Sequence, residues 1–425
     1  IELISRGLDM GISQPKIIFE GYNSTYDKHI TPSYKNNFYY SPFLKLPNSI
    51  PNYIKDSLQV LAAKIIMDSV IPSFKKIKHF FEKEYLPRTR NSIGVSQIPN
   101  GDKYYESRIR YYTTLEIKPQ EIHSLGIAEV EKIKKQMFEV ISKVKFQGDF
   151  NEFLSFLRTN KKFYASSPKE LLVHARDIAK RLDEQLPRFF KHLPRQPYGV
   201  APVPSSIAPK YTGGRYIPAP KDGTSPGFYW VNTYNLSSRP LFNIPALTAH
   251  EAVPGHHLQG ALNKELPDSI PKFRRDLYLS AFGEGWGLYS ELLAEEMGIY
   301  STPYEKFGQL SYSMWRACRL VVDTGIHSFD WTREQAIDYM LNNTALSEHE
   351  INTEVDRYIS WPGQALSYKI GELKIVELRK EAEEKLKEKF NIRDFHESIL
   401  KNGTLTLPLL EDQISEYIAS SLSKN

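Results

Sequence analysis

Four segments of the chain carry the same helix-start signature, in which a serine or threonine is followed three positions later by a glutamate or glutamine. In such a capping box the hydroxyl accepts a hydrogen bond from the backbone of the first helical turn, and the later side chain binds back to the backbone of the cap. The pairs are Ser167 with Glu170, Thr302 with Glu305, Thr332 with Gln335, and Ser347 with Glu350. They predict helices that begin directly after these four hydroxyl residues.

Other helices are predicted from apolar residues that recur at helical spacing. The clearest such segments are 51–85, 119–146 and 405–422. Between Pro194 and Pro226, prolines and glycines are too dense for a helix. The aromatic and β-branched residues of 227–234 then favour a strand or a short hairpin. We therefore predict a mainly α fold with one small β element.

The composition excludes several other classes of protein. Hydrophobic residues make up 41% of the chain, which is enough for a large core and excludes a disordered chain. No apolar run approaches the roughly 18 residues of a membrane span, so we expect no transmembrane segment. A net charge of +5 over 425 residues gives weak support to a nucleic-acid partner, and we expect none. The single cysteine, Cys318, excludes an internal disulfide and a cysteine-rich zinc site.

The segment that points most directly to chemistry has three histidines within eight residues, from His250 to His257. In the common zinc-protease helix, two ligand histidines four residues apart share one face, and the glutamate after the first histidine activates water. Here Glu251 follows His250, but the next histidines are six and seven residues away, at His256 and His257. A regular helix would not bring either of them onto the face of the first.

The residues between the histidines supply a reason for the helix to be distorted. Pro254 removes a hydrogen bond to the carbonyl of His250 and clashes with it, and Gly255 tolerates an unusual turn. A widened turn over 250–255 would bring His256 back toward His250. The simpler interpretation of the segment is a buried helix kink with two surface histidines.

A third ligand is expected to be a carboxylate that lies nearby in space. The best candidate is Glu284, because the glycines on either side of it and at Gly287 would let its helix press closely against another. Glu291 lies seven residues further on the same helix face and could orient a ligand. Taken alone, Glu284 could equally form a salt bridge at a tight helix crossing.

These motifs resemble those of the DUF885 family, a largely uncharacterised bacterial group placed among the zincin-like metallopeptidases. The resemblance rests on the run from His250 to Gln259 and on Glu284-Gly285-Trp286, and it covers about 40–415. Further family-like stretches are 113–126, 321–327 and 357–371. The Glu-x-Trp segment is also similar to the third-ligand helix of thimet-oligopeptidase-like enzymes, in which a Gly-His pair closes the first motif.

The resemblance implies zinc bound by His250, His256 and Glu284, with Glu251 as the general base. It also implies a large helical, two-lobed ellipsoid with a deep central cleft, in a single domain with an N-terminal lobe at about 1–200 and a catalytic lobe at about 201–425. An edge strand is implied beside the zinc helix, and 227–234 fit it. The two extra residues between the histidines leave open whether His256 or His257 is the second ligand. We choose His256, since the ligand directly follows glycine in related motifs, and we expect His257 to face the substrate.

The substrate and the transition state need further partners. Asn232 and Tyr234 would contact an extended peptide that pairs with the strand. Negative charge on the tetrahedral intermediate needs a hydrogen-bond donor, and Tyr368 and His327 are the candidates because they lie in family-like segments. Each of these residues could instead be a satisfied core polar group.

Two cations raise the question of which end of a peptide is attacked. Arg357 and Lys369 could bind the C-terminal carboxylate of a peptide, and the enzyme would then be a carboxypeptidase or a dipeptidase. The alternative for both residues is surface salt bridging.

We therefore expect a zinc peptidase that acts on short peptides within an enclosed cleft. A catalytically inactive, zinc-containing helical binding or cell-surface protein is the alternative, and hydrolysis of a non-peptide amide is a third possibility. The presence of Glu251 favours an enzyme, because a structural site needs no base. The chain begins at Ile1 without a charged and then apolar leader, so its compartment, cytoplasmic or secreted, stays open, as does its oligomeric state.

Overall fold

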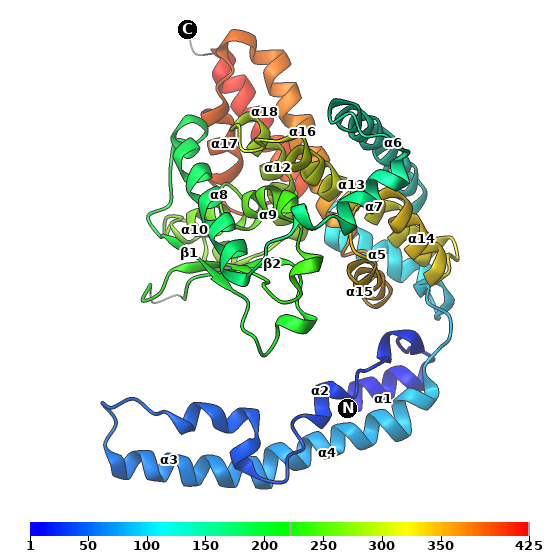
Figure 1. The fold of residues 1–425 in the computed structure, drawn as a ribbon, viewed down its shortest axis with the longest axis vertical. Coiled ribbons are helices and arrows are strands. Elements are labelled where there is room, and N and C mark those ends of the chain that lie inside the picture. The colour runs from blue at the N-terminus through cyan, green and yellow to red at the C-terminus, as the bar shows by residue number, and fades with distance from the viewer. Residues whose placement is uncertain (221–222, 424–425) are drawn as a thin grey trace. The chain divides into compact units, whose positions relative to one another are not determined.

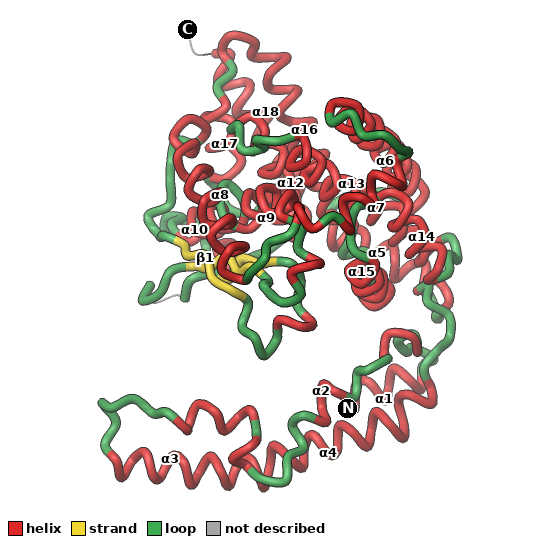
Figure 2. The backbone as a smooth tube through the Cα atoms, viewed as in Figure 1, coloured by secondary structure: helices red, strands yellow, loops and turns green. Residues whose placement is uncertain are grey.

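The computed structural model describes residues 1–220 and 223–423. Its internal contacts divide the chain into two compact units, Ile1–Asp102 and Lys103–Asn425. Helices dominate both units, as the sequence predicts, and the described residues contain one sheet of three strands (Figures 1 and 2). The two lobes expected at about 1–200 and 201–425, with a cleft between them, stay a prediction.

The first unit is built around one long helical segment. Its helices are α1 (Glu2–Asp9), α2 (Ser24–Asp27), α3 (Asn52–Ile65) and α4 (Ile71–Phe80). A π-helical turn at Ile66–Val70 joins α3 to α4, so the helical path from Asn52 to Arg88 is continuous over 37 residues. By length and composition alone this segment meets the requirements for crossing a membrane, with 17% of its most apolar window buried. We expected no membrane span because the sequence has no unbroken apolar run of about 18 residues. The segment Asn52–Arg88 meets the requirements without such a run.

The second unit contains the remaining helices and the sheet. Before the sheet come α5 (Gly101–Thr113), α6 (Pro119–Lys143), α7 (Phe150–Thr159) and α8 (Pro168–Phe189). After it come α9 (Ile244–Glu251), α10 (His256–Lys264), α11 (Lys272–Asp276), α12 (Ser280–Glu296), α13 (Pro303–Ser328), α14 (Arg333–Asn343), α15 (Glu348–Ser360), α16 (Leu366–Leu386), α17 (Ile392–Leu400) and α18 (Leu407–Ser423).

The four predicted helix starts are confirmed. In each case the hydroxyl residue accepts a hydrogen bond from the backbone N–H three residues on, at the start of α8, α13, α14 and α15. The predicted helices 119–146 and 405–422 correspond to α6 and α18. These starts are predictable because a cap is made by neighbours in the sequence.

The sheet differs from the expectation. Its strands are β1 (Tyr198–Pro202), β2 (Gly214–Ile217) and β3 (Gly227–Val231), in the order β1-β3-β2. The strand predicted at 227–234 is therefore central and not an edge strand, because β1 pairs with it in parallel on one side and β2 in antiparallel fashion on the other. The strand at the edge that contacts α9 is β2, which lies in the stretch rich in proline and glycine.

Two helix pairs form the framework behind the site. The helix α13 is buried along most of its length and packs against α6, where Gly126 lets the helices approach so closely that a Cβ there would lie 2.7 Å from Leu320. The helix α12 packs against α16 in the same way, with the backbones of Gly285 and Gly371 in contact. Of the glycines around Glu284 that were predicted to allow a close helix crossing, Gly285 does so.

A buried neutral histidine joins three helices of this framework and makes the stability of the fold depend on pH. His396 of α17 is fully buried, with Nε2 2.8 Å from the Tyr289 hydroxyl of α12 and Nδ1 2.9 Å from the Phe189 carbonyl of α8. Burial lowers the pKa of His396 to about 3. The unfolded chain therefore binds one more proton than the folded chain between about pH 6.5 and pH 3.

We expect acidification through this window to destabilise the fold by about 1.4 kcal/mol per pH unit through His396. Urea unfolding at a series of pH values would measure the slope, and His396→Gln would remove this part of it. His192→Gln is the matched control, since the imidazole of His192 is largely exposed beside Glu397. Equal slopes in the wild type and in His396→Gln would contradict the prediction.

Candidate metal centre

The predicted interruption between the histidines is present, but it is a complete break in the helix. The helix α9 ends at Glu251 and α10 begins at His256. The turn between them is widened, because the N–H of Gly255 donates to the carbonyl of Ala249, 3.0 Å away and six residues earlier. Glycine is required at Gly255, since a Cβ there would lie 1.9 Å from the carbonyl oxygen of His250.

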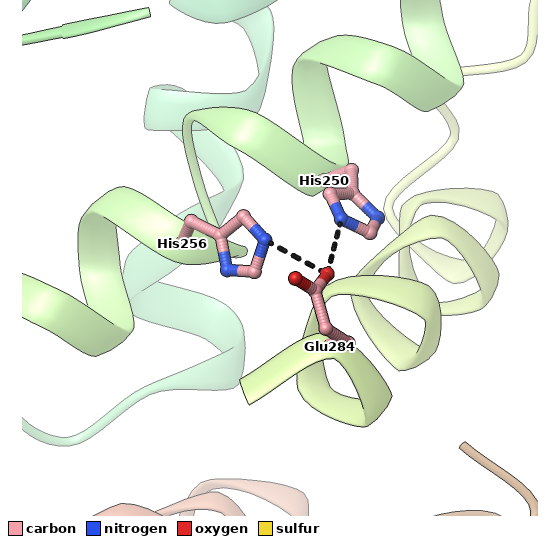
Figure 3. A group of neighbouring side chains, drawn as sticks. All are labelled: His250, His256 and Glu284. Atoms are coloured by element: carbon pink, nitrogen blue, oxygen red, sulfur yellow. Dashed lines mark ion pairs between the residues drawn. The ribbon is translucent and has the colours of Figure 1, made fainter. Parts of the chain in front are cut away.

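This turn brings three potential metal ligands together. His250 at the end of α9, His256 at the start of α10 and Glu284 of α12 point toward one another (Figure 3). The Nε2 atoms of His250 and His256 lie 3.5 and 3.3 Å from Oε2 of Glu284, and the ligand atoms all lie within 4.8 Å of one another. Two imidazoles and one carboxylate are the donor set of many catalytic zinc sites, so these residues fit the metal that the sequence predicted.

The second ring nitrogen of His250 is held from behind. Its Nδ1 lies 2.8 Å from Oε1 of Glu291, which is buried on α12 as the sequence analysis proposed, and Arg316 of α13 lies 3.5 Å from the same oxygen. A carboxylate in this position selects the tautomer in which Nδ1 carries the proton and Nε2 is left to bind a metal. Trp286, from the same glycine-rich run, donates its indole N–H to the carbonyl of Pro254 and so anchors the turn to α12.

In this site, burial and the neighbouring charges shift the pKa values of the ligands in opposite directions. Burial disfavours a charged imidazole, but the carboxylates of Glu284 and Glu291 raise the pKa of His250 to about 9. Burial likewise disfavours the charged form of Glu284, yet the imidazoles of His256 and His250 hold its pKa well below its usual range. The carboxylate is therefore ionised and ready to bind a cation. His256 and Glu284 keep about 16% and 15% of their side chains exposed, so solvent reaches the group from one side.

Gly287 gives room to the first ligand, which leads to a prediction about metal affinity. A Cβ at this position would lie between 2.6 and 3.0 Å from three atoms of the His250 ring. We expect Gly287→Ala to weaken zinc binding by displacing the ring, although alanine favours a helix by about 1 kcal/mol. Competition with a chromophoric chelator would measure the affinity. Gly260→Ala is the control, since its Cβ would meet only the ring of Tyr216 at an ordinary 3.5 Å. Equal zinc affinities of the two variants would refute the steric argument.

Glu251, the predicted base, lies next to the ligands but is not among the three converging groups. Its Oε2 accepts a hydrogen bond of 2.8 Å from the backbone N–H of Tyr216 on β2. This bond orients the carboxylate and leaves Glu251 9% exposed. The N–H of Tyr216 points away from β3, at the edge of the sheet. This outer edge of β2 therefore lies beside Glu251.

His257 does not lie where the sequence analysis expected. It is 1% exposed, its Nδ1 lies 3.1 Å from the Tyr216 hydroxyl, and its ring packs against Tyr198 and Tyr216. Burial lowers the pKa of His257 to about 4, so its imidazole is neutral. Because α10 begins at His256, the two adjacent histidines leave the helix on different sides. The geometry gives His257 a role in holding β2 and no contact with a substrate.

A tyrosine that the sequence analysis missed lies directly at the site. The hydroxyl of Tyr278, in the segment before α12, donates to Oε1 of Glu284 over 3.2 Å. Although Tyr278 is 57% exposed, desolvation of its hydroxyl and the charge of Glu284 raise its pKa. Tyr368 of α16, a predicted donor, is half-buried on the same side, with its hydroxyl 3.4 Å from Arg357. The one signal in the sequence for Tyr278 was Gly283, which makes room for its ring.

The predicted contacts of the strand are divided between the interior and the surface. Asn232 is fully buried, and its amide nitrogen donates to three carbonyls of the preceding loop, those of Ala208, Tyr211 and Thr212. It therefore shapes the loop before β2 and is not placed to bind substrate. Tyr234 is 52% exposed, and its contact with substrate stays a prediction.

Two other predicted residues are held within the helical core. His327 is fully buried on α13, with Nε2 3.0 Å from the carbonyl of Tyr358, so it joins α13 to α15 and does not face the metal centre as a donor. Lys369 is 3% exposed and pairs with Glu372 at 2.7 Å. Its ammonium group also donates to Ser313. Lys369 is therefore a buried structural ion and not a surface cation or a substrate ligand.

Comparisons with known proteins agree on the family and the fold. A family model described as "Bacterial protein of unknown function (DUF885)" matches residues 1–414. The crystal structure of "the putative lipoprotein from Colwellia psychrerythraea" matches with 31% identity and a TM-score of 0.93, over 98% of this chain and 72% of that one. A "putative lipoprotein of unknown function from Shewanella oneidensis" shares the fold at 18% identity and a TM-score of 0.66, over 88% of this chain and 69% of that one. No curated protein matches the chain.

Proposed function

The chain belongs to the DUF885 family, and we propose that it is a zinc-dependent peptidase that hydrolyses short peptides, with Glu251 as the general base. One observation carries the proposal. A carboxylate directly follows the first of three converging ligands, is held by an outward-facing N–H of β2, and is not itself among the ligands. A metal site that only stabilised the fold would not need this carboxylate.

The residues of the site divide the work of hydrolysis. His250, His256 and Glu284 would hold the zinc, and Glu291 would hold a proton on Nδ1 of His250, so that Nε2 is the nitrogen that faces the zinc. When bound, zinc supplies a Lewis acid that polarises a carbonyl and makes water more acidic. Glu251 takes a proton from the attacking water and passes it to the leaving amine.

Two further elements serve the substrate. The outer edge of β2 pairs with an extended peptide and brings its scissile bond beside Glu251. The hydroxyl of Tyr278 lies 3.2 Å from Oε1 of Glu284, and together with the hydroxyl of Tyr368 it stabilises the negative charge that develops on the carbonyl oxygen. The two tyrosines take this role in place of His327, which is buried between α13 and α15.

The test is the digestion of a synthetic peptide library with a mass readout. Protein stripped of metal by a chelator should leave the library intact, and one equivalent of zinc per chain should restore cleavage. Cleavage that is equal with and without metal would reject the zinc mechanism. An intact library in every condition, with zinc bound, would reject the peptidase and favour a binding protein.

A further inference from the structure

A cluster of charged residues lies on α13 and α15, and the mechanism above does not use it. Glu354 of α15 pairs with two guanidinium groups, those of Arg319 of α13 at 2.9 Å and Arg357 of α15 at 3.1 Å. We call these three residues the arginine cluster. Two positive charges thus share one carboxylate, and both arginines hold the pKa of Glu354 below its usual range.

Two further carboxyl groups lie near the arginine cluster. Burial raises the pKa of Glu350. Burial also raises the pKa of Asp323 to about 7, and its oxygens already accept hydrogen bonds from the Tyr105 hydroxyl and the Gly363 N–H. Within the arginine cluster, two guanidinium groups face one carboxylate, so its three residues carry a net positive charge in a largely buried place.

Arg319 is held as if for a ligand. It is 2% exposed, and its guanidinium lies between the rings of Trp315 and Tyr368, 4.4 and 4.3 Å from their centroids. Its Nη1 is buried without a hydrogen-bonding partner among the residues that the structure describes. A buried charged donor left unpaired is costly, so such a position favours an acceptor supplied from outside the chain.

The arginine cluster connects to the metal centre through two tyrosines. Arg357 keeps 28% of its side chain exposed and reaches the Tyr368 hydroxyl at 3.4 Å. Tyr368 follows Ser367 on α16, whose hydroxyl lies 2.8 Å from that of Ser280, and Tyr278, two residues before Ser280, donates to Glu284. A peptide with its scissile bond at the metal centre would therefore extend past these tyrosines toward Arg357.

We propose that Arg357 and Arg319 form a subsite for the free α-carboxylate of a peptide, so that the enzyme recognises the C-terminal end of its substrate. This inference rests on the proposed function and specifies its substrate class. A carboxylate matches the planar fork of a guanidinium and accepts two hydrogen bonds from it. The structure separates the two cations considered from the sequence by their exposure, since 28% of the Arg357 side chain is exposed but only 3% of that of Lys369.

The test compares three synthetic pentapeptide libraries. The first library ends in a free α-carboxylate and the second in a C-terminal amide. The third also ends in an amide, but its last residue is aspartate or glutamate, so its carboxylate belongs to a side chain. Retention on zinc-loaded, immobilised Glu251→Gln protein is read by mass spectrometry, so binding is measured without turnover. We expect the free-acid library to be retained about 10- to 100-fold more strongly than the plain amide.

The same experiment includes two variants and a hydrolysis arm. Arg357→Gln should reduce the preference for the acid to a few-fold at most. Arg333→Gln should keep the preference for the acid. It removes the ion pair between Arg333 of α14 and Asp356, the residue before Arg357 on α15. If Arg357→Gln does not fold, the acid and amide comparison in the parent protein still decides.

Each outcome bears on one proposal. Equal retention of acid and amide, or retention of neither, would overturn the subsite. Retention restored by the acidic side chain would overturn the α-carboxylate assignment. Cleavage of acid and amide alike by the wild-type enzyme would leave the peptidase and remove the subsite. Acid-selective retention without any cleavage would keep the subsite and remove the peptidase.

Discussion

Glu251→Gln will reduce peptide hydrolysis by about 10²- to 10⁴-fold, the usual contribution of a general base. The amide has almost the shape of the carboxylate, and its oxygen can still accept the hydrogen bond from the Tyr216 N–H. The fold and the zinc content should therefore remain, because Glu251 is not among the converging ligands. Rates on a peptide from the library, together with elemental analysis and a melting curve, would measure all three properties.

The control for this variant is Glu265→Gln. Glu265 follows α10 and pairs with Arg195, so the change removes a carboxylate from the same region without touching the metal centre. It should leave the rate near that of the wild type. Near-normal hydrolysis by Glu251→Gln at full zinc content would remove the general-base role, and the binding-protein alternative would then be favoured.

His256→Ala will lower zinc affinity by more than the roughly 10- to 100-fold that follows the loss of an outer partner of a metal site. The reason is geometric: Nε2 of His256 is one of the three donor atoms that converge, and Oε2 of Glu284 lies 3.3 Å from it. Isothermal titration of the metal-free protein with zinc would measure the change. Glu284→Ala should have a comparable effect, and stoichiometric zinc in that variant would contradict the third-ligand assignment.

His257→Ala is the matched partner of this variant, one residue away. It should keep zinc affinity near that of the wild type, because the His257 ring faces Tyr216 and Tyr198. Loss of this buried contact should loosen β2, and we expect lower activity and a fold destabilised by about 1–3 kcal/mol. A variant pair with the opposite effects, zinc lost in His257→Ala and kept in His256→Ala, would show that the second histidine faces the metal.

The difference between these two neighbours illustrates what the local sequence can predict. The distortion near Pro254 follows from a ring clash and a missing N–H within one turn, and the need for glycine at Gly255 follows from the same turn. These are interactions between residues close in the chain. They were enough to favour His256 as the ligand, although the complete break between α9 and α10 was not predicted.

The role of His257 required the tertiary structure, because its partners lie far away in the chain. Tyr216 and Tyr198 come from β2 and β1, and no spacing within the motif points to them. The same holds for Tyr278, which reaches Glu284 from an irregular segment. Asn232 was predicted to contact substrate because it lies in the predicted strand 227–234, whereas its amide donates to carbonyls of the loop before β2.

The helical character, the starts of the capped helices and the candidate ligand set could be predicted from the sequence, because caps, periodicity and a proline–glycine turn act over a few residues. The order of the sheet required the tertiary structure, since strands of four and five residues pair according to the helices that cover them and not according to their own pattern. The tertiary structure also decided that one carboxylate, Glu354, serves both Arg319 and Arg357. That pairing depends on how α13 and α15 pack. The two helices are separated in the chain, and their contact is set by the fit of their buried faces.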